Sequence, residues 1–520
     1  MRVFLSGPMG SGKSTLGRKV AVRLGVPAYD LDQLISDRMR ASIPEIFTRL
    51  GEAGFRSAEA DALGALLAEP GDFVLALGGG TVTQAALRER LLDEGTLVSL
   101  TAPLAVLLGR VRDGAGRPLL AGDDPAARLA LILKSRRAAY AECHGVVDTN
   151  AATMERQVEQ ILALAERKPI AVPLGERSYR VEVASGVREE VFAHLGDVSS
   201  VILVTDETVA PLWLDPVTSA LDTRGIRYTK VILAPGESEK NIHSVQRIWE
   251  TALSFGIDRR SLLVGVGGGV VGDMTGFAAA TLLRGIRVGH LPTTLLSMVD
   301  SAIGGKTGFD TAEGKNLIGA FHQPSFVLAD PETLRTLPDA EFISGFAEVV
   351  KSAWIEGEAA VSMLERDAGA LLERDPAALR RAIRMSCKMK ARIVTADERE
   401  GGLRAVLNLG HTVGHAIEAA QGYGGLRHGE AVALGMVAAC RLAERLAVQS
   451  AATGQRLRSL LAALRLPVEV DQYLDDHSLS FMAADKKRAG AKVTFVVPGE
   501  PGDLRLMPLS LDEVAAAVRS

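Results

Sequence analysis

Two glycine-rich segments of the sequence have the composition of phosphate-binding loops. The first, Gly7–Thr15, reads Gly-Pro-Met-Gly-Ser-Gly-Lys-Ser-Thr and matches the pattern G-x-x-x-x-G-K-[ST]. In such a loop the backbone N–H groups surround the phosphates of a nucleotide, the lysine reaches the terminal phosphates and the hydroxyl reaches Mg²⁺. We therefore expect a nucleoside triphosphate here, bound by Gly10, Ser11, Gly12, Lys13, Ser14 and Thr15.

The second segment, Gly265–Asp273, has a different ending. It lacks the Lys-Ser pair, it follows the apolar run Ser261–Val266, which predicts a buried strand, and it closes on an aspartate. A strand followed by such a loop favours close approach of the backbone to the pyrophosphate of a dinucleotide. The chain is therefore predicted to carry two active sites.

Acidic and basic residues after the first loop could complete a kinase site. One carboxylate of Asp30 and Asp32 could order Mg²⁺ and its water while the other orients an acceptor hydroxyl, although the pair could also cap the next helix. Arg56 could hold a carboxylate through its planar fork, with a solvated surface arginine as the alternative. The three glycines Gly78–Gly80 leave the backbone open to a ligand.

Two further arginines follow. Arg117 comes after a glycine-rich stretch, which is typical of a lid that closes over phosphates, and Arg136 lies on the predicted helix after it. Together with the motifs above, these residues make 1–150 resemble shikimate kinase. The resemblance implies ATP, Mg²⁺ and shikimate as ligands. It implies catalytic roles for Lys13, Asp32 and Arg117, Mg²⁺ binding by Ser14 and Asp30, and shikimate binding by Asp32, Arg56, Gly79, Gly80 and Arg136.

Three of the nine histidines gather in the last third of the sequence. His411 and His415 are four residues apart on one helical face, and His428 follows shortly after. With a carboxylate from elsewhere they would suit Zn²⁺ or Co²⁺, and spacing alone favours His411 and His415 as the ligand pair. The carboxylate candidate is Glu348, although with Lys351 it could merely form a surface ion pair.

Residues 175–520 resemble 3-dehydroquinate synthase. The stretches that carry the resemblance are Gly267–Asp273, Arg284-Gly285, Pro292–Leu296, Val299–Lys306, Lys315-Asn316, Glu348–Lys351, Asp397–Gly401 and the histidine cluster. The resemblance implies NAD⁺ and one divalent metal, and it makes Glu348, His411 and His428 the metal ligands, which leaves His415 for phosphate contact and proton transfer.

The same resemblance implies the remaining roles. NAD⁺ would be bound by Asp206, Glu237, Lys240, Gly268, Gly269, Asp273, Thr293, Thr294 and Lys315. Lys306, Asn316 and Lys351 would join His415 as catalytic residues, and the substrate would be held by Arg284, Asp300, Lys390, Arg404 and Asn408, with Lys486 and Lys487 as further additions.

The implied reaction converts 3-deoxy-arabino-heptulosonate 7-phosphate to 3-dehydroquinate and phosphate. A related sugar-phosphate cyclase and a polyol dehydrogenase are the alternatives for this part, because they share the dinucleotide and metal arrangement. The cations Arg284, Lys390 and Arg404 favour a substrate with a carboxylate and a phosphate. A nucleotide sensor without activity would be expected to have gaps in these motifs, and the sequence has none.

An α/β fold must position these residues. Short apolar strands (Val3–Leu5, Phe73–Leu77, Leu97–Leu100) alternate with amphipathic stretches in 1–165 and predict a P-loop kinase domain with a parallel sheet. A linker at 166–174 precedes a Rossmann-like NAD-binding domain at 175–330, with strands at Tyr179–Val183, Val201–Thr205, Tyr228–Leu233 and Ser261–Val266. Residues 331–520 are predicted to be mostly helical and to bind metal and substrate, with a late hairpin at Lys492–Val497 and Asp503–Met507.

Composition limits the remaining possibilities. A chain of 520 residues is too long for one core, and a net charge of −4 gives no nucleic-acid footprint. The three cysteines have neither metal nor disulfide spacing, and no apolar run reaches membrane-spanning length, so we expect a cytoplasmic protein with small-molecule substrates and no membrane partner. A homodimer through the synthase part is a further expectation.

Overall fold

The computed structural model describes residues 1–111, 124–312, 314–421, 425–475, 477–478, 480–481 and 493–518. The chain divides into two compact units, Met1–Glu182 and Val183–Ser520. The division falls inside strand β7 (Tyr179–Val183), which pairs in antiparallel fashion with β6 (Ile170–Val172). The segment predicted as a linker therefore contains strand β6.

The first unit is a parallel α/β sheet with the strand order β2-β3-β1-β4-β5. Its strands are β1 (Arg2–Ser6), β2 (Ala28–Asp30), β3 (Phe73–Ala76), β4 (Thr96–Thr101) and β5 (Gly145–Asp148). Its helices are α1 (Lys13–Leu24), α2 (Leu31–Met39), α3 (Ile43–Ala68), α4 (Ala85–Glu94), α5 (Leu104–Val111), α6 (Pro125–Ala141) and α7 (Met154–Arg167). The predicted parallel sheet is confirmed.

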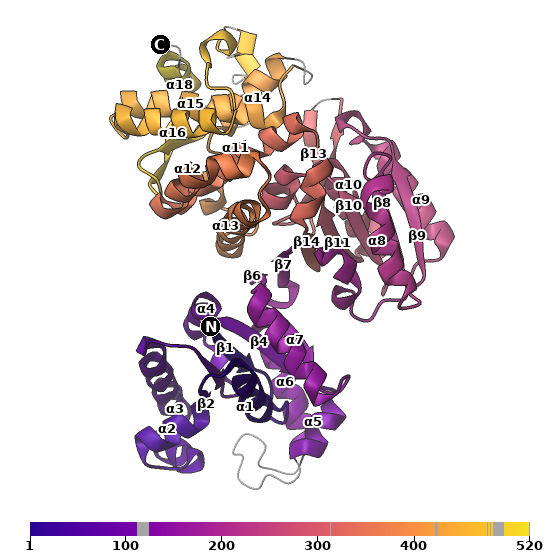
Figure 1. Ribbon diagram of the computed structural model, residues 1–520, viewed down its shortest axis with the longest axis vertical. Coiled ribbons are helices and arrows are strands. Elements are labelled where there is room, and N and C mark those ends of the chain that lie inside the picture. The colour runs from indigo at the N-terminus through magenta and orange to yellow at the C-terminus, as the bar shows by residue number, and fades with distance from the viewer. Residues whose placement is uncertain are drawn as a thin grey trace. The chain divides into compact units, whose positions relative to one another are not determined.

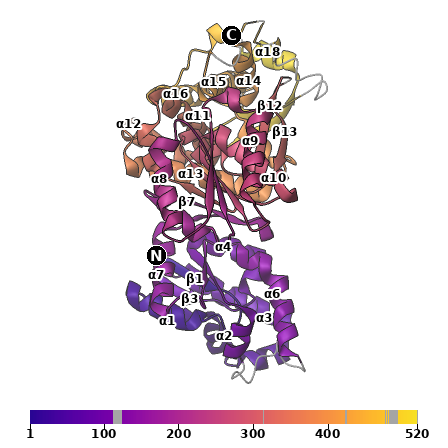
Figure 2. The ribbon, with the colours of Figure 1, turned by 90° about the vertical axis from the view of Figure 1, so that its right-hand side faces the viewer.

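Alternation along the strands divides the apolar side chains of this unit between two cores. In β1, Val3 and Leu5 pack with residues of α1 and α7 on one face, whereas Phe4 packs with residues of α2, α3 and α4 on the other. Successive side chains of a strand point to opposite faces, so one short strand can contribute to both cores. Figure 2 shows α1 and α7 on one side of β1 and β3, with α3 on the other.

The second unit begins with another parallel sheet, in which the strand order is β14-β11-β10-β8-β9. The strands are β8 (Val201–Asp206), β9 (Tyr228–Leu233), β10 (Leu262–Gly267), β11 (Arg287–Pro292) and β14 (Phe326–Ala329), and the helices between them are α8 (Ala210–Asp222), α9 (Ile242–Phe255) and α10 (Gly269–Thr281). Figure 1 shows β8, β9, α8 and α9 in magenta. An antiparallel pair, β12 (Lys306–Thr311) and β13 (Gly314–Phe321), comes before β14.

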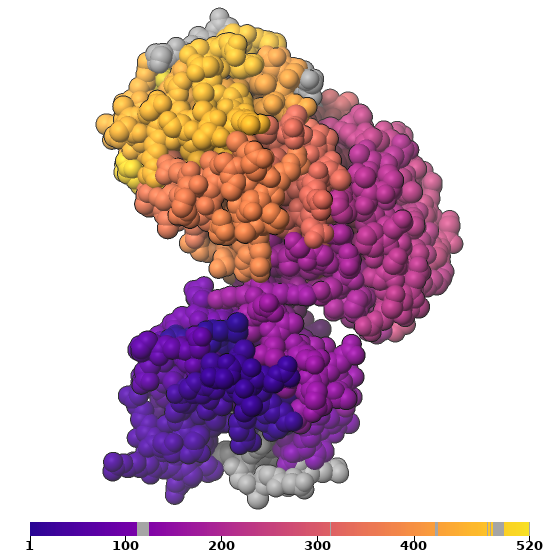
Figure 3. Space-filling model, viewed as in Figure 1, coloured from indigo at the N-terminus to yellow at the C-terminus, as the bar shows by residue number. Residues whose placement is uncertain are grey.

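A mostly helical region completes the second unit. Its helices are α11 (Asp339–Glu356), α12 (Glu358–Leu372), α13 (Pro376–Ala396), α14 (His411–Ala420), α15 (His428–Arg445), α16 (Ala451–Ala463) and α18 (Leu511–Val518). The predicted hairpin is found as β15 (Val493–Pro498) and β16 (Leu504–Leu509). In the space-filling view this orange and yellow region is continuous with the magenta α/β region (Figure 3). The predicted α/β class with a helical last region is confirmed.

Two general expectations can be compared with the described part of the chain. None of its helices is long and apolar enough to cross a membrane. The three cysteines, Cys143, Cys387 and Cys440, all lie in the described part, are buried and form no disulfide.

Candidate active sites

The first phosphate loop connects β1 to α1. Gly7, Gly10 and Gly12 have positive φ angles of 134°, 79° and 91°. At Gly7 a Cβ atom would lie 2.3 Å from the carbonyl oxygen of Leu100, so no side chain fits there. Lys13 Nζ donates to the carbonyl oxygens of Gly7 (2.9 Å) and Pro8 (3.0 Å), which places the ammonium inside the loop. This is the strand, loop and helix that the sequence predicts for a nucleotide-phosphate site.

The two residues predicted to hold Mg²⁺ lie in contact. Ser14 Oγ donates to Asp30 Oδ2 across 2.6 Å. The other oxygen of Asp30 accepts from the backbone N–H of Asp32 at 3.1 Å, because Asp30 is also the N-cap of α2. The alternative of a helix cap is therefore observed, and the same carboxylate also contacts the hydroxyl of the phosphate loop.

Two arginines converge on the three glycines that follow β3. Arg136 Nη1 donates to the carbonyl oxygen of Gly79 at 2.8 Å, and a Cβ atom on Gly80 would lie 2.2 Å from Arg56 Nη2. Asp32 is close as well, since a Cβ atom on Gly78 would lie 3.2 Å from its Oδ1. Glycine at these positions lets two guanidinium groups and a carboxylate share one small space, which suits a ligand with a carboxylate and hydroxyl groups.

A buried carboxylate supports Arg56. Glu59, which has no exposed surface, accepts from Arg56 Nη1 at 2.7 Å, from Thr81 Oγ1 at 2.6 Å and from Gln84 Nε2 at 3.2 Å. The side chain of Arg56 is 17% exposed, so the alternative of a solvated surface arginine is wrong. Arg117, the predicted lid residue, lies outside the described residues.

The second loop joins β10 to α10. Gly267 ends the strand, Gly268 is the N-cap and Gly269 is the first residue of the helix. Cβ atoms on Gly268 and Gly269 would approach Thr294 and Ser301 to 3.0 and 3.1 Å, so these glycines leave little room for any side chain. The first-turn N–H groups of α10 thus face the carboxyl edge of a parallel sheet, where dinucleotides bind.

This edge opens into a cavity of about 1220 Å³. All nine residues predicted to bind NAD⁺ line it: Asp206, Glu237, Lys240, Gly268, Gly269, Asp273, Thr293, Thr294 and Lys315. Asp300, Asn316, His415 and His428 line it too. The cavity is large enough for a dinucleotide together with a small substrate.

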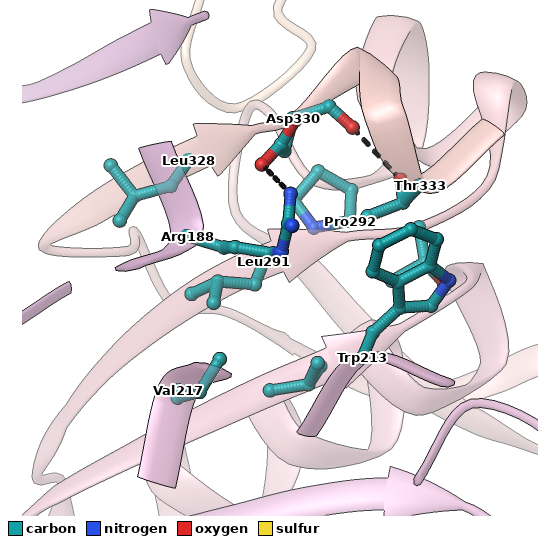
Figure 4. Close-up of a pocket in the computed structure, with 10 residues that line it drawn as sticks. Arg188, Trp213, Val217, Leu291, Pro292, Leu328, Asp330 and Thr333 are labelled. Carbon is teal, nitrogen blue, oxygen red and sulfur yellow. Dashed lines mark hydrogen bonds and ion pairs between the residues drawn. The ribbon is translucent and has the colours of Figure 1, made fainter. Parts of the chain in front are cut away.

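A buried cluster supports the cavity near Thr293. Arg188 forms an ion pair with Asp330, and its guanidinium carbon lies 4.8 Å from the ring centre of Trp213. Figure 4 shows Arg188 beside Asp330, with Trp213 and Pro292 around a small cavity of about 10 Å³. The Nε1 atom of Trp213 donates to Thr336 Oγ1 at 2.9 Å. This cluster fixes the ends of β11 and β14 and was not anticipated from the sequence.

Three helices bring together the residues predicted to hold the metal. Glu348 lies on α11, His411 is the first residue of α14 and His428 is the first residue of α15. His411 Nε2 lies 3.4 Å and His428 Nε2 lies 3.6 Å from Glu348 Oε1. His411 and His415, the pair favoured by spacing alone, do not belong to one donor set among the described residues, because His415 groups with Glu418 and His428.

Close helix packing explains this convergence. A Cβ atom on Gly435 of α15 would lie 1.9 Å from the carbonyl oxygen of Gly410, and one on Gly414 of α14 would lie 2.9 Å from that of Ala431. Gly429 of α15 meets Ser344 of α11 in the same way, at 1.9 Å. Because glycine has no side chain, the three backbones approach closely and their polar side chains meet.

The donor set fits a divalent cation. Neither oxygen of Glu348 accepts a hydrogen bond from the described residues, although Lys351 forms an ion pair with Oε2. Burial alone would raise the pKa of Glu348, but the ammonium of Lys351 and the ring of His411 hold it well below its usual range. Burial and Lys351 lower the pKa of His411 to about 3, so that its imidazole stays neutral. One ionised carboxylate and imidazole nitrogens are suitable ligands for Zn²⁺ or Co²⁺.

Two carboxylates determine the protonation of His428. Burial lowers its pKa, but the neighbouring carboxylates of Glu348 and Glu418 outweigh burial and raise the pKa to about 9. One carboxylate therefore faces each nitrogen of the His428 ring. Lys351 and Glu348 are both almost fully buried, so the alternative of a surface ion pair is wrong.

The predicted substrate residues are distributed unevenly around the cavity. Lys390 Nζ lies 2.6 Å from Oδ1 of Asp300, which lines the cavity, and Arg404 is buried beside the carbonyl oxygen of Gly304 at 3.3 Å. Lys306 pairs with Glu400. Arg284, Lys306, Lys351, Lys390, Arg404 and Asn408 are not among the cavity-lining residues. Lys486 and Lys487 lie outside the described residues.

Family models match three consecutive parts of the chain. The shikimate kinase model matches residues 9–166, the 3-dehydroquinate synthase N-terminal model matches 230–344 and the 3-dehydroquinate synthase C-terminal model matches 345–488. The chain belongs to both families. It is therefore an enzyme with a shikimate kinase domain followed by the two domains of a 3-dehydroquinate synthase-family sugar-phosphate cyclase, here called the synthase domains.

Solved structures resemble each part. A 2-deoxy-scyllo-inosose synthase complexed with carbaglucose-6-phosphate, NAD⁺ and Co²⁺ is 25% identical, with 68% of this chain and 99% of that chain covered and a TM-score of 0.61. A 2-epi-5-epi-valiolone synthase from Streptomyces hygroscopicus subsp. jinggangensis 5008, with NAD⁺ and Zn²⁺ bound, is 27% identical, with 66% and 97% covered and a TM-score of 0.61. Shikimate kinase from Acinetobacter baumannii in complex with shikimate is 39% identical, with 31% and 91% covered and a TM-score of 0.30.

One buried carboxylate of the synthase site was missed. Glu418 contacts both His428 and Lys315. Its sequence signal was available, because Glu418 stands seven residues after His411 and three after His415, so all three share one face of α14.

Proposed function

We propose that the chain catalyses two reactions. The kinase domain would transfer the terminal phosphate of ATP to shikimate with Mg²⁺. The synthase domains would convert 3-deoxy-D-arabino-heptulosonate 7-phosphate to 3-dehydroquinate and phosphate with NAD⁺ and Zn²⁺ or Co²⁺. The observation that carries the second proposal is that one cavity is lined both by the dinucleotide loop and by His428 of the metal donor set.

In the kinase domain, positioning accounts for most of the chemistry. Arg56 and Arg136 would hold the carboxylate of shikimate against Gly79 and Gly80. Asp32 would accept the hydrogen bond of the attacking hydroxyl. Ser14 and Asp30 would hold Mg²⁺ and its water, while Lys13 neutralises charge on the transferred phosphate.

In the synthase domains, bound NAD⁺ and metal would supply a hydride acceptor and a Lewis acid. Glu348, His411 and His428 would hold the metal. Burial raises the pKa of Asp300, but Lys390 and Lys351 reverse this and keep the carboxylate ionised, so that it can orient a substrate hydroxyl. His415 lines the cavity, and burial lowers its pKa. A neutral imidazole there can accept a proton as phosphate leaves.

The structural similarity to cyclases with other substrates supports an alternative. These relatives are named as synthases of 2-deoxy-scyllo-inosose and of 2-epi-5-epi-valiolone. The 3-dehydroquinate reaction is favoured because the family models that match residues 230–344 and 345–488 are those of 3-dehydroquinate synthase.

Activity assays on the full-length chain test both proposals. Phosphate release from the heptulosonate phosphate should require NAD⁺ and metal, and it should exceed release from glucose 6-phosphate, which has no carboxylate. ATP should phosphorylate shikimate in the same preparation. Lys13→Ala should abolish only the kinase reaction and His411→Ala only the synthase reaction. Preference for glucose 6-phosphate would establish the alternative, and loss of both activities in folded Lys13→Ala would contradict two independent sites.

A further inference from the structure

Glu418 is a buried carboxylate that belongs to none of the roles described above. It lies in the last turn of α14, and its side chain is 7% exposed. Both of its oxygens have partners: Oε1 accepts from Lys315 Nζ at 2.8 Å, and Oε2 lies 3.4 Å from His428 Nδ1. A carboxylate is costly to bury unless it is paired, so this position calls for an explanation.

The two nitrogens of His428 face two different carboxylates. Nε2 lies 3.6 Å from Glu348 Oε1, on the side of the metal donor set, and Nδ1 faces Glu418. An imidazole that binds a metal through Nε2 carries its proton on Nδ1, and a carboxylate that accepts this proton fixes both the tautomer and the ring orientation. Glu418 stands where that acceptor is needed.

The other oxygen of Glu418 extends the contact to residues that are predicted to bind NAD⁺. Lys315 Nζ lies 3.6 Å from Glu237 as well as 2.8 Å from Glu418, and both Lys315 and Glu237 line the cavity. One side chain thus connects a metal ligand with a residue of the predicted NAD⁺ set.

We propose that Glu418 is a positioning residue of the synthase site, which holds the His428 ring with Nε2 toward Glu348 and holds Lys315 at the dinucleotide side. The inference rests on the proposed NAD⁺- and metal-dependent function of the synthase domains. It predicts that Glu418 sets metal affinity without touching the metal.

A direct ligand role is the competing explanation. His415, Glu418 and His428 also place donor atoms within 4.8 Å of one another and could hold a second cation. The contacts favour positioning, because a cation at Glu418 would have to displace the ammonium of Lys315 from Oε1 or stand beside it.

Cobalt titration of the full-length, metal-free protein tests the inference, with Co²⁺ absorption as the readout. Glu418→Ala should weaken Co²⁺ binding about 10- to 100-fold while leaving one ion per chain, and Glu418→Gln should recover part of the loss because its amide oxygen can still accept from Nδ1. Glu430→Gln is the matched control. It loosens the start of α15, the helix that carries His428, where Glu430 accepts from the N–H of Arg427, without touching Nδ1. This control should change Co²⁺ binding less than threefold.

Lys315→Met separates the two halves of the inference. It should raise the KM for NAD⁺ and leave Co²⁺ affinity within about threefold, because His428 keeps its carboxylate. Thermal unfolding of the metal-free variants shows whether each of them folds. If Glu418→Ala does not fold, Glu418→Gln and Glu418→Asp serve in its place.

The outcomes are distinct. Unchanged Co²⁺ affinity in a folded Glu418 variant overturns the positioning role, and loss of one of two bound ions shows that Glu418 is a ligand. The proposed metal site itself would be overturned if the wild-type chain did not bind Co²⁺. The same would follow if Glu348→Gln and His411→Ala bound Co²⁺ as tightly as the wild-type chain.

Discussion

Lys240 Nζ lies 2.7 Å from Asp273 Oδ2 and donates to Asn316 Oδ1 at 2.7 Å. The side chain of Lys240 is 6% exposed. The ion pair therefore ties the segment after β9 to the first turns of α10, and the hydrogen bond ties it to β13. Three residues for which sequence resemblance implied cofactor or catalytic roles are joined in one contact.

The first prediction concerns this ion pair. Lys240→Met leaves the carboxylate of Asp273 without its cation, and breaking a buried pair costs about 3–5 kcal/mol. We expect the KM for NAD⁺ to rise more than tenfold and the unfolding midpoint of the synthase domains to fall, with kinase kinetics unchanged. Adding Asp273→Asn should recover stability but not NAD⁺ affinity. Recovery of both would show that the pair is only structural.

The second prediction concerns Arg56 in the kinase domain. Lysine cannot reproduce the planar fork that contacts Glu59 and faces Gly80. Arg56→Lys should raise the KM for shikimate roughly tenfold or more, which is about 1.4 kcal/mol, with the KM for ATP unchanged. Arg49→Lys, on the exposed face of the same helix α3, is the control. Steady-state kinetics that give equal effects for both variants would rule out the proposed carboxylate contact.

The third prediction concerns metal removal. Chelation of the full-length chain should abolish phosphate release by the synthase domains, because Glu348, His411 and His428 lose their shared cation. Zn²⁺ or Co²⁺ should restore this activity and Mg²⁺ alone should not, since imidazole ligands suit the former ions. Kinase activity should return with Mg²⁺ alone. Restoration of both activities by Mg²⁺ would contradict separate metal sites.

The fourth prediction concerns pH. Burial, and to a lesser degree His322, lowers the pKa of His290 to about 4, and Nδ1 of this ring has no hydrogen-bond partner among the described residues. The unfolded chain binds the proton near pH 6.5 and the folded chain only near pH 4, so stability is complete above pH 6.5 and is lost as pH falls toward 4. The loss amounts to about 3 kcal/mol.

Urea unfolding of the synthase domains between pH 4 and pH 7 measures this effect. His290→Gln should flatten the slope in that window, whereas His243→Gln, at an exposed position of α9, should not. An unchanged slope in His290→Gln would assign the acid sensitivity to other groups.

Local signals in the sequence were sufficient to predict the two phosphate loops and several of the longer strands. Each phosphate loop is one continuous segment, so the residues that form it are neighbours in the sequence. The predicted strands Tyr179–Val183 and Tyr228–Leu233 are found with the same bounds. A strand without a clear apolar pattern was missed. The residues of β13 are mostly exposed, so it does not show the pattern of a buried strand.

The site was harder to predict where it depends on tertiary packing. Spacing favoured His411 and His415 as the ligand pair, because residues four apart in the sequence lie on one face of a helix. The donor set formed by Glu348, His411 and His428 depends on how α11, α14 and α15 pack, and only the family resemblance indicated it. Arg188 and Asp330 are 142 residues apart, so no local pattern could join them.

The contacts at Gly414, Gly429 and Gly435 have a consequence for genetics. Each of these glycines faces a neighbouring backbone at a distance that admits no methyl group, and none of them carries a functional group. A random-mutagenesis screen for loss of synthase activity should therefore recover alanine and serine at these three positions as often as changes at the histidines. The metal content of such variants would distinguish loss of the metal site from a general folding defect.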